Sequence, residues 1–280
     1  MLRFGTSGIP RSSARPGTVH GIRRARELGL DHLEMAWVNG VKMSDESADA
    51  IREAAREHDL TLTAHAPYYV NLCGAEDVVE RSLARLVETG RLGARCGAQS
   101  FCFHAGFYGK QSHEEAGDKI LEGLRAVTKG LKKLKAGIDV RTELTGKPTQ
   151  AGSLEEVIAW AAAVPGVHPC IDFSHRYARD AGQHNDYEDF AATLTAIEHT
   201  LGRAALDRLD QVVRTVAADE VFIQHGPIPT AGMGAMTMGF KAPKSGLPAS
   251  VKAGARVDFE FTITSAGEFA LKSIAPAAAK

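Results

Sequence analysis

The segments Leu62-Thr63-Ala64-His65-Ala66-Pro67-Tyr68 and Ser100-Phe101-Cys102-Phe103-His104-Ala105-Gly106 share one arrangement. In each, a short apolar run ends at a histidine, and a proline or glycine follows. Short apolar runs with such boundaries are typical of buried strands. Working outward, we predict strands at Leu62–His65 and Ser100–His104, and at four similar runs: Leu2–Thr6, Leu33–Trp37, Val140–Leu144 and Pro169–Phe173.

Stretches with helical period separate these runs, and several begin at a Ser, Thr or Asp that can cap a helix. They are Val19–Leu28, Ser47–His58, Val78–Gly93, Glu114–Lys135, Leu154–Ala162 and Tyr187–Leu201. Alternation of this kind is the pattern of βα units around a parallel sheet. Residues 1–210 are therefore predicted to form an α/β domain, an incomplete (β/α) barrel of the TIM type with about six βα units.

The pattern changes after about Gln211, where Gly, Pro and Met become frequent and helical period stops. The run Val257-Asp258-Phe259-Glu260-Phe261-Thr262-Ile263 alternates strictly between apolar and polar residues, which is strand period. Residues 211–280 are predicted to form a small all-β domain, an OB-like barrel of four or five strands.

Composition sets broad limits on the function. The chain has 280 residues, 44% hydrophobic and 24% charged, which suits two soluble globular domains. With a net charge of -1, the protein does not have the overall positive charge expected of one that binds nucleic acid tightly, although the total does not exclude a local basic patch. With neither a secretory signal nor a membrane span, and with four cysteines free of any C-x-x-C pair, we expect a cytoplasmic protein with reduced thiols and no membrane partner. The sequence does not specify an oligomeric state.

Five residues that can bind metals lie at or just past the ends of the third to sixth predicted strands: His65, His104, Glu143, Asp172 and His175. In a (β/α) barrel these strand ends converge on one face, where active sites lie. A core histidine or a capping aspartate would explain any one of them alone. Imidazole and carboxylate together suit zinc or manganese, so the five predict a metal site.

The sequence around these positions resembles the endonuclease IV family, apurinic endonucleases on the xylose-isomerase-like barrel. The resemblance runs in order from residue 1 to about 210, through His65-Ala66-Pro67-Tyr68, His104-Ala105-Gly106, Thr142-Glu143-Leu144-Thr145-Gly146 and Cys170-Ile171-Asp172-Phe173-Ser174-His175. It implies a trinuclear zinc centre that cleaves the phosphodiester bond 5′ to an abasic site, with abasic DNA as the partner.

Carried over by position, the resemblance gives each residue a role. His65 and His104 would bind one zinc ion, and Glu143 would bridge two ions and carry the catalysis. Asp172 would bind the second ion and His175 the third. Tyr68 resembles the aromatic residue that enters the DNA at the lesion; the alternative is a rim aromatic that packs on a neighbouring loop.

The family completes its metal centre with ligands from strands seven and eight, which have no counterpart after Leu209-Asp210-Gln211-Val212-Val213. Three hypotheses for the barrel follow. It is a metal-binding remnant of a zinc endonuclease, an active DNA-repair hydrolase with an accessory copper domain, or a sugar isomerase-like barrel. The last is considered because the same fold binds paired divalent ions to move hydrogens on open-chain sugars.

A second group of predicted metal ligands lies in the C-terminal domain: His225, Met233, Met236 and Met238. Thioether sulfur is a soft ligand that selects Cu(I) or Ag(I) over zinc or magnesium. Met236 and Met238 are two apart on a predicted strand and so share a face. The alternative is a Met-rich apolar stripe.

This segment resembles the CusF-like copper and silver chaperones through His225-Gly226-Pro227-Ile228-Pro229 and Ala235-Met236-Thr237-Met238-Gly239-Phe240. The resemblance implies a five-stranded OB-like barrel in which His225, Met236 and Met238 bind Cu(I). A tryptophan would cover the ion where this chain has Met233, which could supply a fourth bond. It also implies a copper-transfer partner protein and a periplasmic setting, in contrast to the cytoplasmic expectation.

Overall fold

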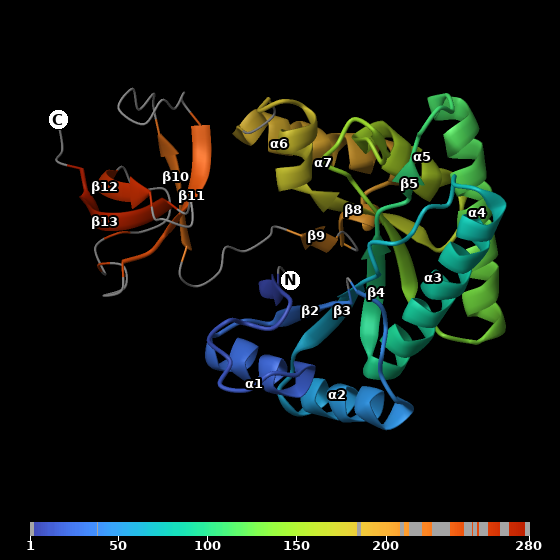
Figure 1. Ribbon diagram of the computed structural model, residues 1–280, viewed down its shortest axis with the longest axis horizontal. Coiled ribbons are helices and arrows are strands. Elements are labelled where there is room, and N and C mark those ends of the chain that lie inside the picture. The colour runs from blue at the N-terminus through green and yellow to red at the C-terminus, as the bar shows by residue number, and fades with distance from the viewer. Residues whose placement is uncertain are drawn as a thin grey trace. The chain divides into compact units, whose positions relative to one another are not determined.

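The computed structural model describes residues 3–37, 39–183, 186–207, 210–212, 220–225, 236–243, 248, 251, 257–263 and 269–277 (Figure 1). The chain divides into two compact units, Met1–Thr215 and Val216–Lys280. Each unit has its own hydrophobic core.

The first unit contains a parallel sheet in the order β1-β2-β3-β4-β6-β8-β9. Its strands are β1 (Gly5–Ser7), β2 (His32–Ala36), β3 (Thr61–His65), β4 (Ala98–Phe103), β6 (Asp139–Glu143), β8 (Val167–Asp172) and β9 (Asp210–Val212). The first six confirm the six predicted strands. Within the described residues β1 and β9 are the two edges, so the sheet is an incomplete barrel.

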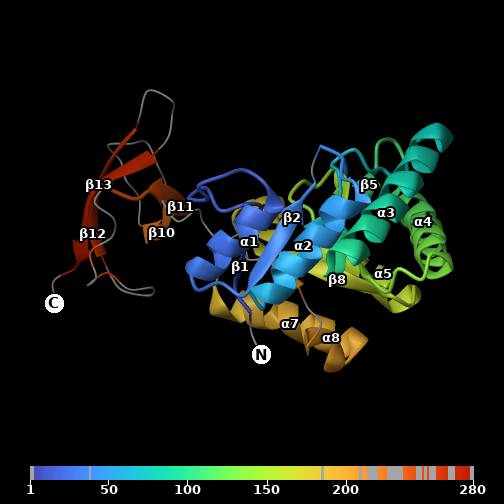
Figure 2. The ribbon, with the colours of Figure 1, turned by 90° about the horizontal axis from the view of Figure 1, so that it is seen from below.

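Helices lie along the outside of this curved sheet (Figure 2). They are α1 (Thr18–Glu27), α2 (Asp45–Glu57), α3 (Glu76–Cys96), α4 (His113–Lys133), α5 (Leu154–Ala163) and α7 (Tyr187–Leu201), and they confirm the six predicted helices. Capping boxes at Ser112 and Ser153 use a glutamate three residues on, so the predicted caps act locally to set these helix starts.

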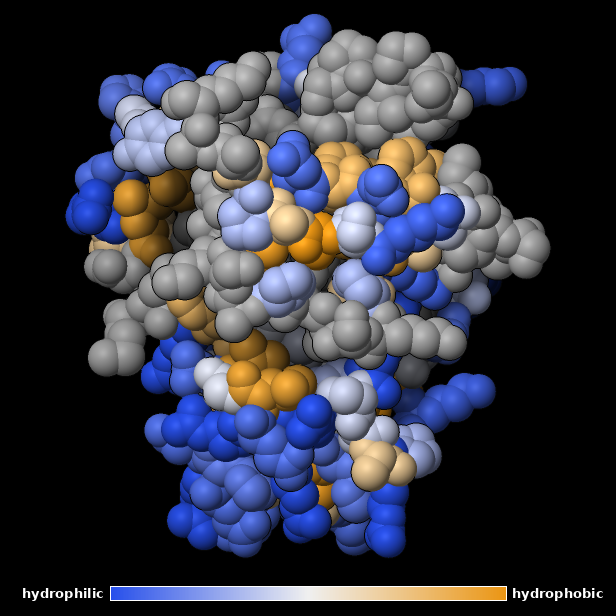
Figure 3. All heavy atoms as spheres, turned by 90° about the vertical axis from the view of Figure 1, so that its left-hand side faces the viewer, coloured by the Kyte–Doolittle hydropathy of each residue, from blue (hydrophilic) through white to orange (hydrophobic). Residues whose placement is uncertain are grey.

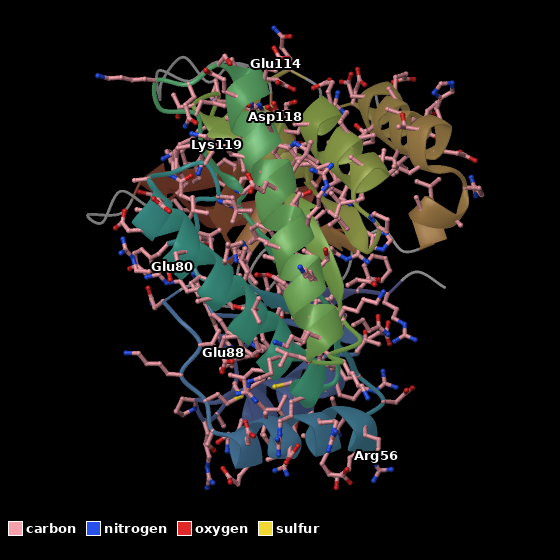
Figure 4. All side chains as sticks on the ribbon, turned by 90° about the vertical axis from the view of Figure 1, so that its right-hand side faces the viewer. Arg56, Glu80, Glu88, Glu114, Asp118 and Lys119 are labelled. Carbon is pink, nitrogen blue, oxygen red and sulfur yellow. The ribbon has the colours of Figure 1, made fainter. Side chains whose placement is uncertain are left out.

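The outer helices are amphipathic. Figure 4 shows Glu80 and Glu88 on α3, and Glu114, Asp118 and Lys119 on α4, on the outer side of the unit. The facing sides of α3 and α4 pack closely at Gly90 on α3, where an added Cβ would lie 2.4 Å from Leu131 Cδ2 on α4. A larger residue at this position would require the Leu131 side chain on α4 to move.

The sequence patterns missed several short elements. A short seventh strand, β9, pairs in parallel with β8 and comes after the six predicted βα units. At three residues, β9 is too short to show a period. Also missed were α6 (Phe173–Arg179), α8 (Ala204–Asp207), and a small antiparallel pair, β5 (Gly106–Phe107) with β7 (Gln150–Ala151).

The second unit is all-β, as predicted. Its strands β10 (Glu220–His225), β11 (Met236–Lys241), β12 (Val257–Ile263) and β13 (Phe269–Pro276) form a sheet in the order β10-β11-β13-β12. The alternating run predicted as a strand is β12. Phe240 is fully buried, and its ring lies 5.2 Å from Phe259 and 5.1 Å from Phe261.

On the face drawn in Figure 3, hydrophilic side chains are interspersed with hydrophobic ones. Among the described helices, none is long and apolar enough to cross a membrane.

Candidate metal centre

Four of the predicted metal ligands meet at the carboxyl end of the sheet. His65 ends β3, His104 directly follows β4, and Glu143 ends β6. His175 lies on α6, the short helix that begins directly after β8. Because the strands are parallel, their carboxyl ends share one edge of the sheet, and this edge brings the four side chains together.

Glu143 is the centre of the group. Its Oε2 lies 3.0 Å from His65 Nε2 and 3.4 Å from His104 Nε2, and its Oε1 lies 3.0 Å from His175 Nδ1. The carboxylate is 1% exposed and His65 is 5% exposed. Three imidazoles therefore surround one buried carboxylate.

Three atoms of this group are buried and lack hydrogen-bond geometry toward any partner: His65 Nε2, His104 Nε2 and Glu143 Oε2. A buried polar atom without a hydrogen bond costs about 1–3 kcal/mol. The ligand atoms of His104, Glu143 and His175 lie within 4.8 Å of one another, as do those of His65, Cys102 and Glu143. A metal ion would satisfy these atoms, so the residues present fit one.

The charges are strongly coupled. Burial raises the pKa of Glu143, but the imidazoles of His104, His175 and His65 outweigh burial and hold that pKa well below its usual range. Burial lowers the pKa of His65, but contact with Glu143 outweighs it and raises that pKa to about 9. The pKa of His175 is raised in the same way. Without metal, a proton on His65 therefore supplies the positive charge that Glu143 requires.

Backbone carbonyls orient two of the imidazoles. His65 Nδ1 donates to the Ala66 carbonyl at 2.7 Å, which leaves Nε2 as its ligand atom. His175 Nδ1 lies 2.9 Å from the Leu144 carbonyl. In His65 the hydrogen bond on the second ring nitrogen fixes the tautomer, as is usual for a metal-binding histidine, whereas in His175 the same Nδ1 faces both Leu144 and Glu143.

Asp172 lies beside this group in a second role. It is fully buried, and its Oδ1 accepts from the backbone N of His175 at 2.9 Å and from Ser174 Oγ at 2.5 Å. Its Oδ2 is 3.5 Å from His175 Nδ1. Asp172 thus caps α6 and fixes the position of His175.

Tyr68 lies at the rim of the group. Its ring centroid is 5.3 Å from that of His65 and 5.8 Å from that of His104. Half of the residue is exposed. Tyr68 therefore presents an accessible aromatic surface beside the histidines.

Arg179 connects the two segments that carry Glu143 and His175. It ends α6, and its Nη1 donates to the carbonyl of Lys147, in the loop that follows β6, at 2.8 Å and to that of Gln150, which begins β7, at 3.0 Å. Its Nη2 lies 3.4 Å from Tyr108 Oη, which donates to Glu156. Arg179 is therefore a positioning residue for the centre.

Replacing Arg179 with Ala is expected to weaken metal affinity by about 10–100-fold, the usual effect of removing support behind metal ligands. The matched control is Arg176→Ala, because Arg176 is on the same helix but contacts α7 instead, through the Asp189 carbonyl. Zinc titration against a chelator checks this. Equal weakening in both variants would show that α6 acts only through general stability.

Sequence reasoning missed two buried residues beside the centre, Glu34 and Cys102, whose Sγ donates to Glu34 Oε2 at 3.5 Å. Glu34 lies in β2, is 5% exposed, and accepts from Ser7 Oγ at 2.5 Å. Burial raises its pKa. The sequence feature that could have identified Glu34 is its charge inside the apolar run Leu33-Glu34-Met35, because buried glutamates are rare without a specific partner.

In the second unit, the backbone brings three of the predicted copper ligands to neighbouring positions. His225 at the end of β10 pairs with Met236 at the start of β11, and Met238 pairs with Ile223. Met233 lies outside the described residues.

Comparison with known proteins places both parts of the chain. Residues 22–223 match the family described as xylose isomerase-like TIM barrel, and residues 209–276 match the copper binding periplasmic protein CusF. An uncharacterized protein of Methanocaldococcus jannaschii is 35% identical over 207 residues, 74% of each chain.

Two solved structures show the same fold. Endonuclease IV from Thermus thermophilus has 23% identity and a TM-score of 0.55, with 74% of each chain covered. D-psicose 3-epimerase from Clostridium cellulolyticum, solved with D-tagatose, has 16% identity and a TM-score of 0.57, with 69% of this chain and 70% of that one covered. The chain belongs to the xylose isomerase-like TIM barrel family and carries a CusF-like domain after the barrel.

Proposed function

We propose that this is a two-site metal-binding protein. The barrel binds zinc and the CusF-like domain binds Cu(I) or Ag(I). The observation that carries the barrel assignment is the convergence of three imidazoles on the buried Glu143 carboxylate. Three of the atoms that meet there, His65 Nε2, His104 Nε2 and Glu143 Oε2, are buried and lack hydrogen-bond geometry. The proposed ligands are His65, His104, Glu143 and His175, with Asp172 beside them, and His225, Met233, Met236 and Met238 in the second domain.

The ligand set favours zinc over magnesium and calcium. Those two ions prefer sites made of oxygen atoms, whereas zinc accepts imidazole nitrogen with carboxylate oxygen. The group holds three imidazoles and one central carboxylate. In the second domain, thioether sulfur selects a soft monovalent ion instead.

Zinc affinity of the barrel is expected to rise with pH. Because the pKa of His65 is raised to about 9 without metal, zinc must displace its proton at neutral pH. The proton on His65 alone makes the apparent affinity rise by about tenfold per pH unit below that pKa, and this contribution levels off above it. Competition with a chelator between about pH 6.5 and 9, corrected for the chelator's own protonation, measures this. A flat profile would contradict the proton displacement.

A second candidate function is hydrolysis of phosphodiester bonds in abasic DNA. Tyr68 favours it, because an exposed ring beside the histidines can stack on the unpaired surface at a lesion. A bound zinc ion would supply Lewis-acid polarisation of the phosphate. Glu143 would keep the three imidazoles in place, and Asp172 would keep α6 in register.

The sugar isomerase alternative is less well supported by the carboxylates. Proton transfer to a sugar carbon needs an acid or base within reach of the substrate. Glu34, Glu143 and Asp172 are at most 5% exposed and contact internal partners. Their positions suit ligand support better than proton transfer to a bound sugar.

Two parallel assays separate these functions: incision of a duplex with one abasic-site analogue, and interconversion of D-psicose and D-fructose. The second candidate function predicts incision alone, retained in Tyr68→Phe and reduced in Tyr68→Ala. Sugar conversion without incision would show that the barrel is a sugar isomerase and not a hydrolase. Neither activity in the zinc-loaded protein would leave metal binding as its function and exclude the hydrolase.

A further inference from the structure

The barrel interior below the metal centre has an unusual composition. Glu34 on β2, Cys102 on β4 and Cys170 on β8 come from alternate strands of the sheet. Alternate strands contribute the side chains of one interior layer in a TIM barrel, and such layers are dominated by branched apolar residues. Here a carboxyl group and two thiols take their place, which apolar packing does not explain.

Cys102 connects this layer to the metal centre. Its Sγ donates to Glu34 Oε2 at 3.5 Å and also contacts Cys170. Cys102 pairs with His65 in the register of β3 and β4. Its Sγ and the ligand atoms of His65 and Glu143 all lie within 4.8 Å of one another.

A second observation points to a ligand at this position. His65 Nε2 and Glu143 Oε2 are buried and lie 3.0 Å apart without hydrogen-bond geometry toward each other or any other partner, and both residues belong to the same group as Cys102. The group therefore joins one nitrogen, one sulfur and one oxygen donor, all from buried residues. Zinc accepts this mixed set, with thiolate as its softest donor.

We propose that Cys102 is a thiolate ligand at an inner metal position formed with His65 and Glu143, next to the outer position of His104, Glu143 and His175. The inference rests on the proposed zinc binding and adds a sulfur ligand to it. On binding, the S–H bond breaks, its electron pair stays on sulfur to form the bond to the metal, and the proton leaves to solvent. No oxidation is involved.

Cobalt(II) loading of the full chain tests the proposal, because thiolate coordination gives an intense near-ultraviolet charge-transfer band. We expect this band in the wild-type protein and its loss in Cys102→Ser. The matched controls are Cys170→Ser in the same layer and Cys96→Ser, a buried thiol on α3 that contacts Met43. Both controls should keep the band.

The outcomes separate this inference from the zinc proposal. Cobalt bound without the band, or a band that survives in Cys102→Ser, overturns the thiolate and leaves zinc binding intact. No bound cobalt overturns both. If Cys102→Ser does not fold, X-ray absorption of the zinc-loaded wild type decides: a sulfur shell at about 2.3 Å supports the thiolate, and its absence refutes it.

Discussion

Replacing Glu143 with Gln is expected to abolish zinc binding by the barrel at ordinary zinc concentrations. The carboxylate contacts all three imidazoles, so its loss removes the shared charge of the centre. Removing only the support behind a ligand costs about 10–100-fold in metal affinity, so losing the central ligand itself should cost more. Gln has nearly the same shape, so the fold should persist.

Zinc titration against a chelator measures this loss. The control is Glu115→Gln, which removes an exposed carboxylate from the capping box of α4 and should bind zinc normally. In the same Glu143 variant, the pKa of His65 should fall from about 9, since Glu143 raises it against the effect of burial. If Glu143→Gln binds zinc as tightly as the wild type, Glu143 is not the central ligand of the site. The same variant should also lose any incision of abasic DNA.

The double replacement Met236→Ala with Met238→Ala is expected to lower Cu(I) affinity by orders of magnitude. The two methionines lie on β11, and Met236 pairs with His225 across the strand pair. Their removal would leave two of the four proposed donors, His225 and Met233, and take away two of the three thioethers that select Cu(I) over zinc.

Competition with a Cu(I) chelator under anaerobic conditions measures this affinity. The double variant Met236→Leu with Met238→Leu keeps the apolar volume and removes only the sulfur, so it should lose the same affinity. Met43→Leu in the barrel should change nothing. A double variant that competes as well as the wild type would show that the methionines are packing residues.

The sequence predicted the strands and helices because their periods are long and clear. The six helices and first six strands were confirmed, whereas β9 and α6 are too short to show a period. The shortness of α6 matters for the site. His175 was expected just past a strand, but it lies in the first turn of a helix that Asp172 caps.

The outer part of the candidate centre could be predicted because parallel strands share a carboxyl edge. His65, His104 and Glu143 needed only their strand-end positions. Glu34 and Cys102 could not be found in this way. Their contact depends on the register across β2, β3 and β4, which is set by tertiary packing and not by the pattern within any strand.

In the second unit, the sequence predicted the strand character of residues 257–263 from strict alternation. The pairing of His225 with Met236 depends on the register between β10 and β11, which no pattern within either strand specifies. The position of Met233 as a fourth ligand stays a prediction.

The most direct test of the account is the metal content of the full chain by elemental mass spectrometry. The protein is purified without added metal, then exposed to zinc and, under anaerobic conditions, to Cu(I), with desalting after each step. We predict at least equimolar zinc that is lost in Glu143→Gln, and equimolar copper that this variant retains. Copper without zinc in the wild-type protein would contradict the central claim, because the barrel would then hold no metal at Glu143.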